Sequence, residues 1–100
     1  MDKKEEINAE EIYKSALALW GKSQIGMATE ECGEFITAVN KLARSTNEGF
    51  DEMRYKLCSE IADVQIMMEQ MAIMFGKEDV EYWRKFKLNR LKFRISQSQK

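Results

Sequence analysis

Apolar residues recur at helical spacing along four stretches of this chain of 100 residues. The pattern predicts helices over about residues 7–20, 23–44, 51–75 and 78–95. Breaks fall at Gly21, at residues 45–50 and at Gly76, and the chain contains no proline. We expect Ser23 to cap the second helix, and residues 1–5 and 96–100 to be flexible. The sequence therefore predicts one all-α domain over residues 1–100.

Two of these predicted helices carry carboxylates within or beside their apolar faces. On a helical wheel with about 100° per residue, Glu31 falls inside the apolar arc of the second helix and Glu34 at its edge. In the third helix, Glu60 falls inside the arc and Asp63 at its edge. Residues three apart project from one face, and a carboxylate on an apolar face is costly unless a cation or partner neutralises it. Two facing pairs would offer four oxygen ligands, which suit Mg²⁺ or Mn²⁺.

The alternative interpretation is that these acids are surface carboxylates paired with lysines along their helices. Either Glu31 or Glu60 alone would favour that interpretation. Their matching placement in two helices favours a metal site. Glu30 falls outside the apolar arc, toward solvent.

The last predicted helix is basic, and no acidic residue follows Glu81. A cationic stripe bordered by apolar residues on both sides is formed by Trp83, Lys87, Arg90 and Arg94. Such a stripe calls for an anionic partner, and beside a metal site phosphate binding is the favoured role. For Trp20 and Trp83 we expect core packing, with stacking on a base as the alternative. Gln24, Asn40 and Lys41 are further polar candidates for contacts with a base.

The net charge of −1 gives no overall attraction to nucleic acid or to a membrane, and no apolar run is long enough to span a bilayer. Cys32 and Cys58 are expected to be free, buried thiols in a reducing cytoplasm. The chain has no histidine, which argues against a di-iron site built on Glu-x-x-His. A domain of this size gains only modest stability from one core, so we expect it to form an oligomer.

The ordered set Glu30-Glu31-x-x-Glu34 and Glu60-x-x-Asp63 resembles the EExxE and ExxD motifs of the MazG-like all-α nucleoside triphosphate pyrophosphohydrolases. Further similarity lies at Trp20, Gly21 and Gln24, at residues 61–64, and in the basic residues from Lys87 to Arg94. The resemblance covers roughly residues 16–95. Each motif alone is weak, whereas the ordered set on the right helices is fairly specific.

The resemblance implies a fold like a four-helix bundle, assembled as a dimer or a dimer of dimers. It implies Mg²⁺-dependent hydrolysis of a nucleoside triphosphate to the monophosphate and pyrophosphate. Glu31, Glu34, Glu60 and Asp63 would be the metal ligands. Glu30 or Glu34 would act on the attacking water, and the substrate would be bound by Lys87, Arg90, Arg94, Trp20, Gln24 and Trp83.

Two other functions stay open beside this one. A non-catalytic helical module could dock its basic last helix on an acidic partner, which would leave the acids unexplained. A family member that has lost activity, or one that binds nucleotides as a sensor, is the other possibility, although the presence of every motif acid argues mildly against loss of activity. The sequence does not indicate which base is preferred.

Overall fold

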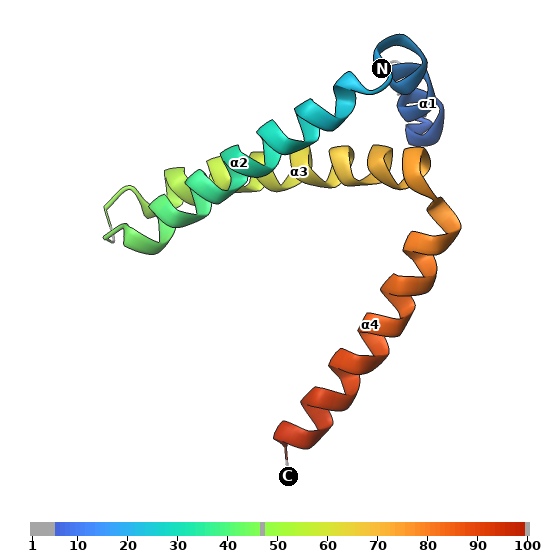
Figure 1. Ribbon diagram of the computed structural model, residues 1–100. Helices are drawn as coiled ribbons and strands as arrows, with labels where there is room; N and C mark the ends of the chain where they lie inside the picture. Colours follow the sequence, from blue (N-terminus) through green and yellow to red (C-terminus); the bar gives the residue numbers. More distant parts are fainter. Residues whose placement is uncertain (1–5, 47, 100) are drawn as a thin grey trace.

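The computed structural model describes residues 6–46 and 48–99, which form four helices and no strand. These are α1 (Ala9–Trp20), α2 (Ser23–Arg44), α3 (Phe50–Phe75) and α4 (Lys77–Ser98), shown in Figure 1. The all-α prediction is confirmed, and the predicted helix bounds are correct to within three residues. None of these four helices combines the length and apolar character needed to cross a membrane.

Two glycines set the bends between helices. Gly21 ends α1 with a φ of 49° and donates its N–H to the Leu17 carbonyl, and Gly76 separates α3 from α4 with a φ of 141°. Side chains other than hydrogen are disfavoured at these angles. The Ser23 cap prediction is wrong, because Ser23 already belongs to α2 and donates its hydroxyl to the Trp20 carbonyl at 2.6 Å. The tight turn places that carbonyl of α1 within reach of the hydroxyl.

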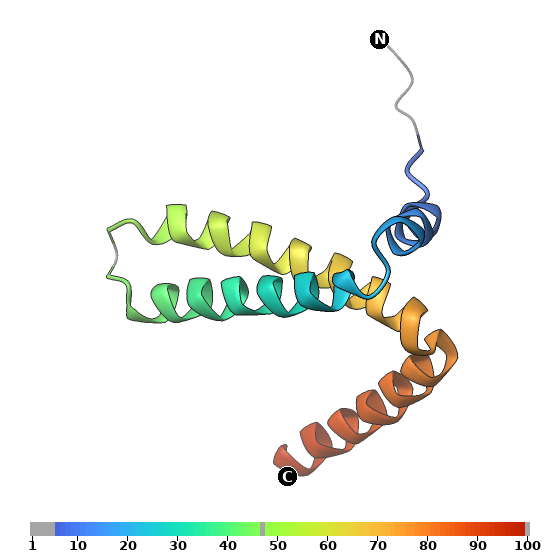
Figure 2. The ribbon, with the colours of Figure 1, turned by 45° about the horizontal axis from the view of Figure 1, so that its top comes forward.

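Helices α2 and α3 form an antiparallel hairpin that makes up most of the packed structure (Figures 1 and 2). The buried residues of the hairpin lie where the two helices face each other: Gln24, Ala28, Ala38, Leu57, Met67 and Gln70. Gln24 donates its side-chain amide to the Gln70 side-chain carbonyl at 2.7 Å. Since a buried amide requires a partner, this bond helps to fix the helices' register. Both cysteines are free, but only Cys32 is half-buried. The prediction that Cys58 is buried is wrong.

Helix α1 lies across the open end of this hairpin (Figure 2). Its buried residue is Tyr13, whose hydroxyl donates to Glu69 of α3 at 3.1 Å. Burial and the neighbouring Glu69 carboxylate raise the pKa of Tyr13. Glu10 of α1 pairs with Lys77 at the start of α4. These two polar contacts join α1 to the helices on either side of Gly76.

Helix α4 points away from the other three helices (Figures 1 and 2), and none of its residues is buried. Bundle-like packing of four helices is therefore not seen within one chain. The core-packing prediction for Trp20 and Trp83 is also wrong within the chain, because they are 58% and 53% exposed. Residues 96–98 were expected to be flexible but continue α4. Residues 1–5 and Lys100, also expected to be flexible, lie outside the described residues.

Candidate metal centre

Three of the predicted ligands converge from the two helices of the hairpin. Glu31 and Glu34 of α2 and Glu60 of α3 each place one carboxylate oxygen within 4.8 Å of the others. Their spacing brings them together because residues three apart on α2 share the face that meets α3. Asp63, one turn after Glu60, is half-buried and lies outside this group of three. The three glutamates are called the acid cluster below.

Two oxygens of the acid cluster are buried without a hydrogen-bond partner. They are Oε2 of Glu31 and Oε2 of Glu60, and no described residue donates to either atom. An unpaired buried polar atom is destabilising, and more so when it is charged. The wheel placed these two acids inside the apolar arcs, and the structure buries their oxygens there.

The electrostatics of Glu31 agree with this geometry. Burial raises the pKa of Glu31, and the negative charges of Glu34, Asp63, Glu60 and Glu30 raise it further. Both causes act by disfavouring the ionised carboxylate. A divalent cation would reverse the second cause and would satisfy the unpaired oxygens. The donor set, carboxylate oxygens with no histidine in the chain, fits Mg²⁺ or Mn²⁺.

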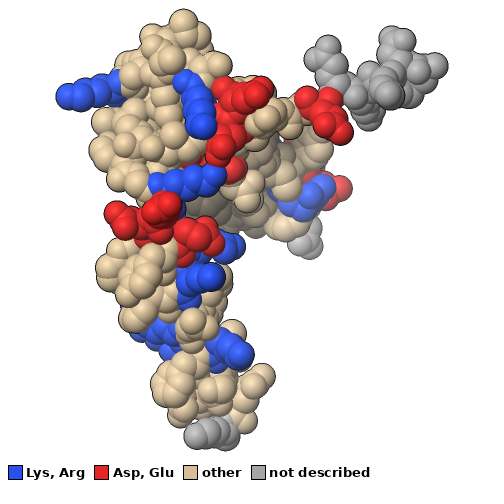
Figure 3. Space-filling model, turned by 90° about the vertical axis from the view of Figure 1, so that its right-hand side faces the viewer, with Lys and Arg blue, Asp and Glu red and all other residues tan. Residues whose placement is uncertain are grey.

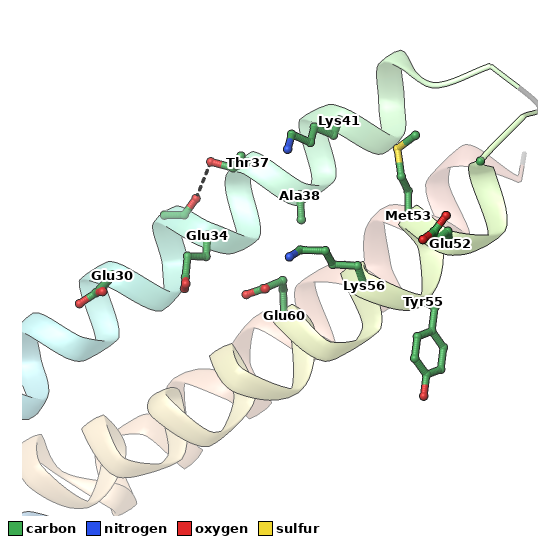
Figure 4. A pocket seen from close by; sticks show the side chains of 12 residues that line it. Glu30, Glu34, Thr37, Ala38, Lys41, Glu52, Met53, Tyr55, Lys56 and Glu60 are labelled. Atoms are coloured by element: carbon green, nitrogen blue, oxygen red, sulfur yellow. Dashed lines mark hydrogen bonds between the residues drawn. The ribbon is translucent and has the colours of Figure 1, made fainter.

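A groove of about 930 Å³ opens beside the acid cluster, between α2 and α3. Its lining residues are Glu30, Gly33, Glu34, Thr37, Ala38, Lys41, Gly49, Glu52, Met53, Tyr55, Lys56 and Glu60. In Figure 4, Glu34, Glu60 and Lys56 extend into the space between the helices, and Lys41 lies across from Lys56. Glu30 is exposed and borders the groove from the turn before Glu34. The groove therefore joins a negative region to a positive one.

Sequence reasoning missed Lys56 and gave Lys41 no role beyond a possible base contact. The signal that could have found them is helical spacing from the acids. Lys56 precedes Glu60 by four residues, and Lys41 follows Glu34 by seven. At these spacings each lysine lies on the same helix face as the glutamate with which it is compared.

The predicted substrate-binding residues do not line this groove. Gln24 is buried in the hairpin with its amide bonded to Gln70, and Trp20 is exposed at the end of α1. The remaining four, Trp83, Lys87, Arg90 and Arg94, lie on α4. Figure 3 shows Lys and Arg side chains amid uncharged surface along the projecting lower part of the molecule, which α4 forms. Within one chain, the structure does not bring the basic stripe to the acid cluster.

Comparison of the chain with protein-family models, curated proteins and solved structures finds no significant match.

Proposed function

We propose that this protein is a metal-dependent nucleoside triphosphate pyrophosphohydrolase of the MazG-like type. The observation that supports the proposal most is the acid cluster: three carboxylates from two helices, with two buried oxygens that have no partner. Carboxylates in this setting repel one another, and a cation would neutralise them. A groove beside it has room for a nucleotide. The reaction would convert a nucleoside triphosphate and water into the monophosphate and pyrophosphate.

Glu31, Glu34 and Glu60 would hold Mg²⁺, with Asp63 next to them on α3. When bound, the ion would neutralise charge on phosphate oxygens and so ease attack by water. Glu30 is exposed, borders the groove and lies outside the acid cluster, so its carboxylate could contact a water molecule in the groove. We therefore assign Glu30 the role of orienting or deprotonating the water, with Glu34 as the alternative.

The proposal includes an assembly of two or four copies. Support comes from α4, whose large apolar residues are all exposed in the single chain: Val80, Tyr82, Trp83, Phe86, Leu88, Leu91, Phe93 and Ile95. An apolar surface of this extent is typical of an interface. A second copy packed on α4 would cover it. Such packing could also bring Lys87, Arg90 and Arg94 of one copy to the acid cluster of another.

The test is pyrophosphate release from a panel of normal and modified ribo- and deoxyribonucleoside triphosphates, with Mg²⁺, with Mn²⁺ and with EDTA. We expect release from some members of the panel that stops in EDTA. Glu60→Gln should abolish release while circular dichroism shows unchanged helicity. Glu11→Gln, which removes an exposed charge from α1, is the matched control and should keep activity. Full activity of Glu60→Gln would overturn the ligand assignment.

A non-catalytic binding module is the second candidate, favoured by the uncovered apolar and basic surface of α4. On that view α4 docks on an acidic partner protein and the acid cluster has no catalytic role. No pyrophosphate release from any triphosphate, in protein shown to be folded, would favour this candidate. Stabilisation by Mg²⁺ or Mn²⁺ would count against it.

A further inference from the structure

Two lysines face the groove from opposite helices. Lys41 on α2 and Lys56 on α3 both line it, and Figure 4 shows them across from each other near Glu60. They lie on the side of the acid cluster that leads toward Met53. A ligand that reached from the acid cluster along the groove would therefore meet both ammonium groups.

Neither lysine forms an ion pair with another residue that the structure describes. Lys56 has glutamates four residues before and four residues after it, at Glu52 and Glu60. This spacing commonly gives ion pairs on a helix. Yet the ion pairs formed within residues 6–46 and 48–99 are Lys14–Glu10, Arg54–Asp51 and Lys77–Glu10, and they include neither groove lysine. Both positive charges are thus available to an anion in the groove.

Helix geometry places these charges in line with the carboxylates. With a rise of about 1.5 Å per residue, Lys56 lies about 6 Å along α3 from Glu60, and Lys41 lies about 10 Å along α2 from Glu34. A linear anion with several phosphates could lie with one phosphoanhydride at the acid cluster and its terminal phosphates between the lysines. A ligand with fewer phosphates would make fewer of these contacts.

We propose that Lys41 and Lys56 form the subsite for the terminal phosphates of the substrate and make the enzyme prefer nucleoside triphosphates over diphosphates. This inference rests on the proposed function, and it assigns pyrophosphate binding to the hairpin of a single chain. Lysine is a common phosphate ligand because its ammonium group is a compact charge with three donors. The two lysines would bind the substrate without taking part in the bond-breaking step, since that bond would lie at the acid cluster.

The test compares wild-type protein with Lys41→Gln, Lys56→Gln, Lys56→Arg and the control Lys22→Gln, an exposed lysine at the start of α2 that does not line the groove. Calorimetry measures binding of inorganic tripolyphosphate in Mg²⁺, and steady-state kinetics give kcat/KM for a nucleoside triphosphate and its diphosphate. Each glutamine variant should bind tripolyphosphate about tenfold more weakly. It should lose a similar factor in kcat/KM for the triphosphate and little for the diphosphate.

Lys56→Arg should keep most of the tripolyphosphate affinity and most of kcat/KM for the triphosphate, and Lys22→Gln should match wild type in both quantities. An equal loss with both substrates, or none with either, would overturn the inference while leaving the proposed function in place. If the wild type releases no pyrophosphate but binds tripolyphosphate through these lysines, the subsite stands and the proposed function fails. If the wild type neither binds tripolyphosphate nor releases pyrophosphate, both fail.

Discussion

Replacing Glu31 or Glu60 by glutamine should change the stability of the protein in opposite directions with and without metal. Without metal, each carboxylate carries a buried oxygen that no described residue bonds, and burial, followed by the neighbouring negative charges, raises the pKa of Glu31. Leaving a buried charged group unpaired costs about 1–3 kcal/mol or more. Glutamine removes the charge but still buries a polar atom. We therefore expect each variant to be more stable than wild type in EDTA, by about 1 kcal/mol.

With metal, the order should reverse. Free Mg²⁺ or Mn²⁺ at a hundred times its Kd stabilises the wild type by about 2.7 kcal/mol. For a domain of this size 1 kcal/mol shifts Tm by about 4–8 °C, so the expected rise is roughly 10–20 °C. A variant that lacks one carboxylate ligand should show only a small part of this rise in Tm.

Thermal unfolding followed by circular dichroism measures the difference in Tm between each variant and wild type, in EDTA and with metal. All samples are kept at one protein concentration because association also shifts Tm. The control is Glu11→Gln, whose carboxylate is exposed on α1. Its Tm should follow wild type with and without metal. The reasoning is refuted if the two cluster variants are less stable than wild type in EDTA and metal leaves the wild-type Tm unchanged.

Three further predictions concern the packing of the helices. Burial raises the pKa of Tyr13 above its ordinary value of 10.0, so its neutral form contributes stability below that pH and loses the contribution as pH rises through the folded-state pKa. The difference in unfolding free energy between wild type and Tyr13→Phe, measured by urea titration, should therefore shrink above pH 10.0. Gln24→Leu should lower the unfolding free energy by about 1–3 kcal/mol because Gln70 loses its partner. A double variant with Gln24→Leu and Gln70→Leu that is no more stable than the single variant would contradict this account. Leu91→Glu should weaken self-association at least tenfold, as measured by sedimentation equilibrium, because burial of a leucine at an interface contributes about 1.5–3 kcal/mol. Unchanged association would exclude Leu91 from the interface.

Features set by local sequence could be predicted in advance. Gly21 and Gly76 end their helices because each adopts a backbone angle that other residues avoid. The inside positions of Glu31 and Glu60 follow from the wheel because α2 and α3 pack along much of their length. In a long antiparallel hairpin, the apolar arc of each helix is the face that meets the other. A wheel therefore indicates which side chains point inward.

Features set by contacts outside the hairpin could not be predicted in this way. The direction of α4 depends on the backbone angles of Gly76. The pattern of apolar residues gives no information on these angles. Trp83 was expected in a core, yet it is exposed on α4. There it contacts Phe86 edge-on with ring centroids 5.8 Å apart. Cys58 falls within an apolar pattern but lies beside Arg54 on an exposed face. A wheel indicates an apolar face but not what covers it.

The hairpin and α4 would contribute to activity in different ways. The acid cluster and both groove lysines belong to α2 and α3, so metal and terminal phosphates could bind to one copy. Helix α4, which carries the basic stripe, projects away from the hairpin, and none of its residues lines the groove, so the stripe could act on a phosphate only in a groove of another copy. A Leu91→Glu variant that no longer associates should then keep its stabilisation by metal. If such a variant also kept full turnover, the proposed role of Lys87, Arg90 and Arg94 in substrate binding would be excluded, and the two groove lysines would be the remaining candidates.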